Sequence, residues 1–184
     1  MKIAIDQLIG DEMLRQNRML HEAPEGFGGS GWKHAEKIVE FAREIRAESL
    51  LDYGCGECTL RRHLKRLEFH IDIREYDPAI PRLAKLPKPA DLVVCTDVLE
   101  HVEPDKLMRV MAHLYSLSIT GCYLVIATRK ANKILPNGRN AHLIVQDAAW
   151  WRHRVELLPW AITHEDDRRK GDGSGHEVRY WLKA

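Results

Sequence analysis

The stretch Leu50-Leu51-Asp52-Tyr53-Gly54-Cys55-Gly56-Glu57-Cys58-Thr59-Leu60 decides the fold of this chain. An apolar run, expected as a strand over residues 49–53, ends in two closely spaced glycines, and a helix is expected over residues 59–66. Glycine has no Cβ, so the backbone can turn sharply there and a ligand can approach it closely. The free N–H groups of the following helix favour a carboxylate or a phosphate. The stretch therefore predicts a ligand-binding strand-loop-helix unit.

An acidic residue follows the next expected strand, which covers residues 69–76. It is Asp77, 21 residues after Gly56, and Pro78 comes directly after it. A carboxylate at this spacing from a glycine loop can accept two hydrogen bonds from a ribose diol. The alternative is that Asp77 only caps the turn at Asp77-Pro78. The glycine loop and Asp77 together favour the ribose.

Strand-like and helix-like segments alternate along the rest of the chain. Helices are expected over residues 4–20, 32–46 (with Ser30 as N-cap), 104–117 and 147–157, and strands over residues 91–96, 122–128, 161–164 and 178–182. This alternation predicts an α/β fold with a mainly parallel sheet between helices and an antiparallel hairpin at the C-terminus. We expect one domain, 1–184, in which N-terminal helices (1–47) cap a core (48–184).

The composition is that of a globular protein. The 184 residues fit one domain, and 45% of them are hydrophobic and 30% charged. The 28 basic and 27 acidic residues balance, so charge alone would not drive binding to nucleic acid. No apolar run reaches the roughly 18 residues that span a bilayer, and the first residues lack the apolar region of a signal peptide. We therefore expect a cytoplasmic protein without membrane contact.

These features resemble the class I S-adenosylmethionine-dependent methyltransferase superfamily. The matching segments are Leu51-Asp52-Tyr53-Gly54-Cys55-Gly56, Tyr76-Asp77-Pro78 and the stretch from Asp91 to Val102, in the order that the family has them. The resemblance extends from about Ser49 to the end of the chain. It implies a Rossmann-like three-layer sandwich, with S-adenosylmethionine as methyl donor and S-adenosylhomocysteine as product.

The resemblance also assigns cofactor contacts. In the family, the glycine loop contacts the methionine part, the acid after the second strand holds the ribose, and the turn after the fourth strand helps to hold the amino-acid end. Carried over to this chain, these contacts belong to Asp52, Gly54, Cys55, Gly56, Asp77, Pro78, Thr96 and Asp97.

This chain departs from the family pattern in two places. The third glycine is replaced by Cys58. This missing glycine and the absence of a G-x-G-x-x-G motif both argue against a nicotinamide dehydrogenase. Only residues 79–90 separate Asp77 from the next strand, where the family fits a helix and a strand. Pro81, Pro87 and Pro89 disfavour both. We expect the third strand to be short or missing.

The catalytic residues are expected to be Glu100, His101 and His142. Methyl transfer from a sulfonium is an in-line displacement that needs a base only if the acceptor must lose a proton. Glu100 and His101 follow a strand whose end faces the expected crevice, and His142 lies in the long loop after the next strand. The alternatives are structural: Glu100 and His101 cap the next helix, and His142 hydrogen-bonds its own loop.

A metal site at the same place is the less favoured interpretation. Asp97, Glu100, His101 and His142 look like the metal-binding set of small-RNA 2′-O-methyltransferases, and two carboxylates with two imidazoles suit Mg²⁺, Mn²⁺ or Zn²⁺. The same Asp-x-x-Glu-His string also occurs in many metal-free relatives. We therefore expect no bound metal.

We predict an enzyme that methylates an O or N atom of a small-molecule or nucleotide-like acceptor. Trp150, Trp151 and Trp160, with the basic run Arg168-Arg169-Lys170, leave a nucleic-acid acceptor open, although helix packing and a solvated surface explain them as well. The alternative is a non-catalytic cofactor-binding or partner-regulating module with the same fold. The glycine-rich loop 24–31 either closes over the cofactor, with Trp32 or Lys33 touching it, or only joins two helices. The sequence does not predict an oligomeric state.

Overall fold

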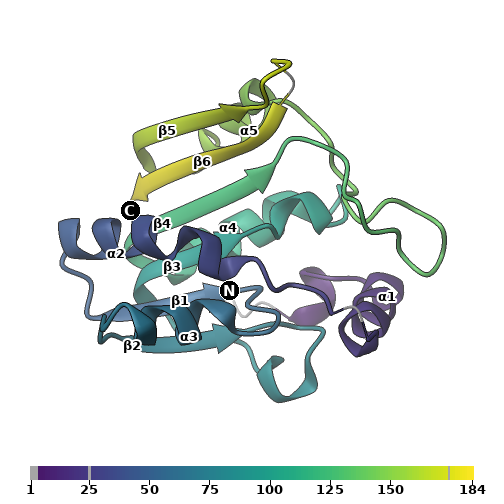
Figure 1. The fold of residues 1–184 in the computed structure, drawn as a ribbon, viewed down its shortest axis with the longest axis horizontal. Coiled ribbons are helices and arrows are strands. Elements are labelled where there is room, and N and C mark those ends of the chain that lie inside the picture. The colour runs from purple at the N-terminus through teal and green to yellow at the C-terminus, as the bar shows by residue number, and fades with distance from the viewer. Residues whose placement is uncertain (1–3, 25, 174) are drawn as a thin grey trace.

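The computed structural model describes residues 4–24, 26–173 and 175–184 and has a central sheet between two layers of helices (Figure 1). Met1–Ile3, Glu25 and Ser174, which belong to the start of the chain, the glycine-rich loop and the hairpin tip, lie outside the described residues. The six strands are β1 (Ser49–Tyr53), β2 (Asp72–Tyr76), β3 (Ala90–Thr96), β4 (Ser118–Ala127), β5 (Ala161–Arg169) and β6 (Gly175–Lys183).

The sheet has the strand order β2-β1-β3-β4-β6-β5. Strands β2, β1, β3 and β4 are parallel, whereas β6 runs antiparallel to both β4 and β5. This confirms the predicted mainly parallel sheet with an antiparallel C-terminal hairpin. Between β2 and β3 the chain forms only the short 3₁₀ helix η3 (Pro81–Leu83). This confirms the prediction that the strand which the family has at this place, its third, is short or missing.

The two faces of the sheet bury different helices. Helices α2 (Ala35–Glu44) and α3 (Thr59–Arg66) pack on one face, and α4 (Leu107–Leu117) and α5 (Ala148–Val155) pack on the other (Figure 1). Alternate residues of β4 divide between the layers: Leu124 joins the α4 side and Val125 the α2 side. A strand covered on both faces is apolar throughout, which explains its continuous hydrophobic run.

The N-terminal segment differs from the expected single helix over 4–20. It forms a 3₁₀ turn, η1 (Ile5–Gln7), and then α1 (Asp11–Glu22), with Gly10 between them. The Gly10 N–H donates to Glu103 Oε2 at 2.9 Å, a contact with a distant part of the chain that no local pattern predicts. Helix α1 packs beside the loop that follows β4, apart from the two main layers (Figure 1).

Other boundaries also shift. The expected helix 32–46 is divided into the 3₁₀ helix η2 (Gly31–His34) and α2, and Ser30 makes no capping hydrogen bond. Helix α4 begins later than predicted, and the hairpin strands β5 and β6 are longer than predicted. Among the described residues, no helix has both the length and the apolar character that crossing a bilayer requires.

Candidate active site

A cavity of about 530 Å³ lies where β1, β2 and β3 end. The chain leaves β1 toward one sheet edge and β3 toward the other, and such a reversal point is where open α/β sheets bind ligands. The volume is in the range of small-molecule sites. All eight residues predicted to contact the cofactor line it: Asp52, Gly54, Cys55, Gly56, Asp77, Pro78, Thr96 and Asp97.

The glycine loop cannot accommodate side chains at its two glycines. Gly54 has φ +76°, and a Cβ there would stand 2.4 Å from Val98 Cγ2. Gly56 has φ +49°, and its Cβ would stand 2.4 Å from the carbonyl oxygen of Gly28. The second contact comes from the N-terminal glycine-rich loop, so two glycine loops pack backbone against backbone.

Asp77 is fixed at the end of β2 by two backbone groups. Its Oδ2 accepts the Gly56 N–H at 3.1 Å, and its Oδ1 accepts the Ala79 N–H at 2.9 Å. The Ala79 bond is the turn cap foreseen as the alternative, and the Gly56 bond ties the carboxylate to the glycine loop. Each carboxylate oxygen keeps a lone pair for a further donor. Capping and ligand binding are therefore compatible roles for this residue.

Asp52 is the buried carboxyl group behind the glycine loop. Burial, reinforced by the nearby Glu75 and Asp77 carboxylates, raises the pKa of Asp52 to about 7. A positively charged ligand group in the cavity would favour its ionised form.

The N-terminal loop covers one side of the cavity. The Gly28 carbonyl accepts the Glu57 N–H at 3.2 Å, and the Ser30 hydroxyl donates to Asp97 Oδ2 at 2.6 Å. Lys33 lines the cavity, whereas Trp32 packs against the His63 ring. The described part of this loop is thus more than a link between helices, and of the two side chains considered only Lys33 reaches the cavity.

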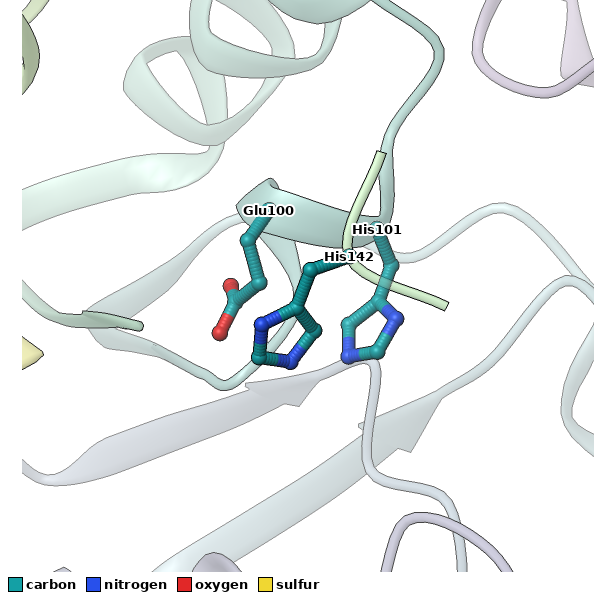
Figure 2. Close-up of side chains that lie close together, drawn as sticks. All are labelled: Glu100, His101 and His142. Carbon is teal, nitrogen blue, oxygen red and sulfur yellow. The ribbon is translucent and has the colours of Figure 1, made fainter. Parts of the chain in front are cut away.

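His101 and His142 form a pair of imidazoles on the cavity wall. His101 Nδ1 lies 2.8 Å from the Ala141 carbonyl oxygen, and His142 Nδ1 lies 2.5 Å from that of Arg129. A carbonyl oxygen only accepts, so each Nδ1 carries the proton and each Nε2 keeps its lone pair. The ring centroids are 4.7 Å apart and the rings are nearly perpendicular (Figure 2).

Both imidazoles are held neutral. Burial, together with the His142 ring beside it, lowers the pKa of His101 to about 4. Burial also lowers the pKa of His142. Two neutral rings with free Nε2 lone pairs can accept a proton or a hydrogen bond from a ligand in the cavity.

Glu100 lies behind the histidines and does not line the cavity. It is part of the 3₁₀ helix η4 (Leu99–His101) and fully buried, and its Oε1 accepts the Ala127 N–H at 2.9 Å. Burial and the nearby Asp97 raise the pKa of Glu100 to about 8. Glu100 thus ties the turn after β3 to the end of β4, and its carboxyl group bonds β4 instead of capping α4.

Three residues of the predicted metal set come together. Glu100, His101 and His142 offer ligand atoms within 4.8 Å of one another, and Figure 2 shows the His142 ring between the other two side chains. Asp97 is not in this cluster, and its Oδ2 accepts the Ser30 hydroxyl. A cation would have to displace the proton that burial favours on Glu100. That no metal binds stays a prediction.

Several cavity residues were not found from the sequence. His21 Nε2, on α1, lies 3.8 Å from Asp77 Oδ2. The Phe27 ring makes edge contacts with both the His21 and the His101 rings. Arg129 and Lys133 reach the cavity from the loop after β4. The length of that loop was the one available signal.

The tryptophans mostly serve packing. Trp151 of α5 and Trp160, which follows this helix, are buried in the core, and Trp150 of α5 is partly buried against the same core. Trp151 and Trp160 are therefore not available as a stacking surface for bases.

Comparison with known proteins gives one consistent fold. Residues 32–167 match the family model of methyltransferase domains. The 1,6-didemethyltoxoflavin N1-methyltransferase of Burkholderia thailandensis, solved with 1,6-didemethyltoxoflavin and S-adenosylhomocysteine, has a TM-score of 0.67 at 13% identity, over 100% of this chain and 92% of that chain.

Two further solved structures agree. Magnesium protoporphyrin IX methyltransferase of Synechocystis PCC 6803, solved with S-adenosylhomocysteine, has a TM-score of 0.56 at 14% identity, over 98% of each chain. The methyltransferase domain of a bacterial Hen1 has a TM-score of 0.61 at 12% identity, over 83% of this chain and 100% of that domain. No protein of curated function matches. At these identities the structural likeness concerns the fold.

Proposed function

We propose, since this chain belongs to the class I S-adenosylmethionine-dependent methyltransferases, that it transfers the methyl group to an O or N atom of a small-molecule or nucleotide-like acceptor. The observation that carries this proposal is the neutral histidine pair on the wall of the same cavity as the glycine loop.

The cofactor end of the cavity supplies the binding groups. The close backbone approach at Gly54 and Gly56 suits the methionine part, and the Asp77 carboxylate suits the ribose diol. Thr96 and Asp97 would hold the amino-acid end. The carboxylates at this end complement the positive charges of an amino group and a sulfonium.

The histidine pair supplies the proton acceptor. An attacking oxygen or nitrogen becomes a better nucleophile when a neighbouring base takes its proton, and an imidazole that stays neutral at pH 7 has a lone pair available for this proton. Both rings are fixed through Nδ1, so each Nε2 has a defined direction. Glu100 is a positioning residue in this proposal, because it ties His101's turn to β4.

A small acceptor is favoured over a long polymer. The relative with the highest TM-score reported above, which matches the whole chain, was solved with the small heterocycle 1,6-didemethyltoxoflavin. Trp151 and Trp160 are buried, so neither can serve as a platform on which bases of single-stranded nucleic acid would stack.

The test combines cofactor binding with turnover. We would titrate S-adenosylhomocysteine and NAD by calorimetry, and then measure transfer of a labelled methyl group to a panel of phenols, N-heterocycles and nucleosides. We expect S-adenosylhomocysteine but not NAD to bind. We expect His101→Gln and His142→Gln to lower kcat at least tenfold while S-adenosylhomocysteine affinity stays within twofold. His153→Gln, at an exposed position of helix α5, is the matched control.

The pH profile separates a base from a structural histidine. Burial lowers the pKa of His101 to about 4, so a base at His101 predicts that kcat falls only as pH drops through about 4 and not at the ordinary histidine value of 6.5. A structural histidine predicts no such limb, and His101→Gln should lack it. Binding of NAD alone would refute the proposal. Cofactor binding with no transfer to any acceptor, and no effect of the histidine substitutions, would favour the non-catalytic module.

A further inference from the structure

Two cations accompany the histidine pair on the cavity wall. The Arg129 carbonyl accepts the His142 Nδ1–H, so Arg129 is fixed next to that ring. The Lys133 carbonyl accepts the Ala141 N–H at 3.1 Å, and the Ala141 carbonyl in turn accepts the His101 Nδ1–H. The backbone that orients the imidazoles therefore also positions Arg129 and Lys133, and both line the cavity.

Neither cation forms an ion pair with a carboxylate in the described part of the chain. Arg129 Nε donates to His176 Nδ1 at 3.1 Å, and Arg129 Nη1 donates to the Lys130 carbonyl at 3.3 Å. Neither acceptor is a carboxylate that would balance the charge of the guanidinium. Lys133 is half-buried. A partly desolvated cation without a counter-charge costs free energy that a bound anion would recover.

The charge of Arg129 is felt at the proposed reaction centre. It contributes to the lowered pKa of His142 and opposes the raised pKa of Glu100. The positive charge of its guanidinium therefore acts on the histidine pair. An anion bound there would lie beside the atom that accepts the methyl group.

Three carboxylates that line the cavity already accept hydrogen bonds from the chain itself. Asp77 is bound by the glycine loop and Asp97 by Ser30, and Glu103 accepts the Gly10 N–H. Lys33 is close in sequence to Ser30, at the amino-acid end of the cofactor site, where a methionine carboxylate needs a cation. Arg129 and Lys133 remain for the acceptor.

We infer that Arg129 and Lys133 form an anion subsite, and that the acceptor carries a carboxylate or a phosphate next to the hydroxyl or N–H that is methylated. This inference rests on the proposed function, because it assigns the histidine end of the cavity to the acceptor. It narrows the acceptor class to carboxylic acids and phosphate esters that carry a hydroxyl or an N–H group near the anion. Guanidinium and ammonium groups bind both anions.

The test uses small anions on the full chain saturated with S-adenosylhomocysteine. The probes are inorganic phosphate and benzoate, with benzamide as the neutral match of benzoate, at constant ionic strength. Binding is followed by backbone amide shifts in two-dimensional NMR. The variants are Arg129→Gln, Lys133→Gln and the double variant. Lys130→Gln is the matched control, since Lys130 is exposed on the same loop and does not line the cavity.

We expect saturable benzoate or phosphate binding with shifts at residues 129–142, and at least tenfold weaker affinity in the double variant. Lys130→Gln should stay within twofold of the wild type, and benzamide should not bind. Whichever anion binds more tightly identifies the group on the acceptor.

Three results would overturn the inference: no saturable anion binding, equal affinity in the double variant, or weakened S-adenosylhomocysteine binding in Arg129→Gln and Lys133→Gln alike, which would assign both cations to the cofactor. Lys133→Gln keeps the test decisive if loss of the Arg129 contact to His176 disturbs the fold. Failure of the wild type to bind S-adenosylhomocysteine at all would instead count against the proposed function.

Discussion

The two ends of the cavity are assembled differently. The cofactor end consists of short turns that directly follow three adjacent parallel strands, at Gly54, Asp77 and Asp97. The end proposed for the acceptor combines η4 with the loop after β4, and Met13 of α1 packs in one apolar cluster with Leu135 of this loop. The first end is fixed by strand geometry, whereas the second depends on contacts between distant segments. A fold built in this way can keep one cofactor while its loops change the acceptor.

The two ends also differ in charge. Asp52, Asp77 and Asp97 place carboxyl groups at the cofactor end. Neutral imidazoles with Arg129 and Lys133 stand at the other end. A cationic donor and an anionic acceptor would therefore be drawn to opposite ends, which aligns the methyl group between them.

The largest expected effect comes from Gly56→Ala, which tests whether the cofactor end depends on the N-terminal loop. The new Cβ would stand 2.4 Å from the Gly28 carbonyl oxygen and 2.8 Å from Gly28 Cα, at φ +49°. Backbone cannot give way as a side chain can, so one loop must shift. We expect S-adenosylhomocysteine affinity, measured by calorimetry, to fall by roughly 100-fold or more, because the glycine loop itself is displaced.

Gly138→Ala is the matched control. Gly138 also has a positive φ, +85°, but a Cβ there meets nothing within 4 Å. It should cost only the left-handed conformation, about 1 kcal/mol of unfolding free energy, with affinity unchanged. Equal affinity losses in both variants would mean that the contact between the two glycine loops has no role in binding.

A smaller loss is expected from Asp77→Ala, which probes the cofactor end alone. The carboxylate proposed to hold the ribose would be removed, and we expect binding to weaken by about 1–3 kcal/mol, the scale of hydrogen bonds to a charged group. Asp72→Ala, at the exposed start of the same strand, is the control and should leave affinity unchanged. Thermal unfolding of both variants separates lost binding from lost structure. Unchanged affinity in Asp77→Ala would remove the ribose role.

Glu100→Gln tests the buried carboxyl group that ties the turn after β3 to the end of β4, through the pH dependence of stability. Burial raises the Glu100 pKa from 4.5 to about 8, so between these values the folded chain holds a proton that the unfolded chain has lost. The unfolding free energy should therefore fall as pH rises from about 4.5 to 8, by at most about 1.4 kcal/mol per pH unit for this group. Glutamine does not titrate, so the variant should lose this part of the slope and gain stability near pH 8.

Urea unfolding between pH 5 and 8.5 measures the slope, and Glu36→Gln, exposed on α2, is the control. Asp52, whose pKa is raised to about 7, adds a slope of the same sign that both variants retain. Wild-type and Glu100→Gln slopes that coincide would show that Glu100 is ionised in the folded chain.

The two ends of the cavity also differ in how far the sequence predicts them, and the strands and turns of the cofactor end were predicted best. β1 (Ser49–Tyr53) and α3 (Thr59–Arg66) have the predicted bounds, because apolar periodicity and the glycine loop are local signals. The place of Asp77 on the cavity wall followed from its spacing to Gly56. The missing third strand followed from prolines between β2 and β3, since proline removes a ladder donor.

At the end proposed for the acceptor, local patterns predicted His101 and His142 but not the residues beside them. Gly10 interrupts the expected N-terminal helix with its N–H bonded to Glu103, 93 residues away. Arg129 and Lys133 reach the cavity through backbone contacts with the histidine segment that no periodicity encodes. β5 was underestimated because its exposed polar residues lack the alternation that marks a half-buried strand.

The smallest effect is expected at Cys58, where this chain lacks the third glycine of the family pattern. Cys58 has φ +55°, so it has the left-handed conformation that glycine would adopt there. Cys58→Gly relieves about 1–2 kcal/mol of left-handed strain and costs up to about 1 kcal/mol of unfolded-state entropy. We expect unfolding free energy within about 1 kcal/mol of the wild type and unchanged S-adenosylhomocysteine affinity, measured by urea unfolding and calorimetry.

Cys58→Val is the opposing variant at the same position. Its β-branched side chain is disfavoured at positive φ, so it should be destabilised relative to Cys58→Gly. If Cys58→Gly instead loses affinity tenfold while Cys58→Val stays stable, the thiol itself supports the cofactor loop through its weak contact with the Gly56 carbonyl, 3.7 Å away. The backbone account predicts the reverse order, because at the cofactor end the path of the chain matters more than the side chains it carries.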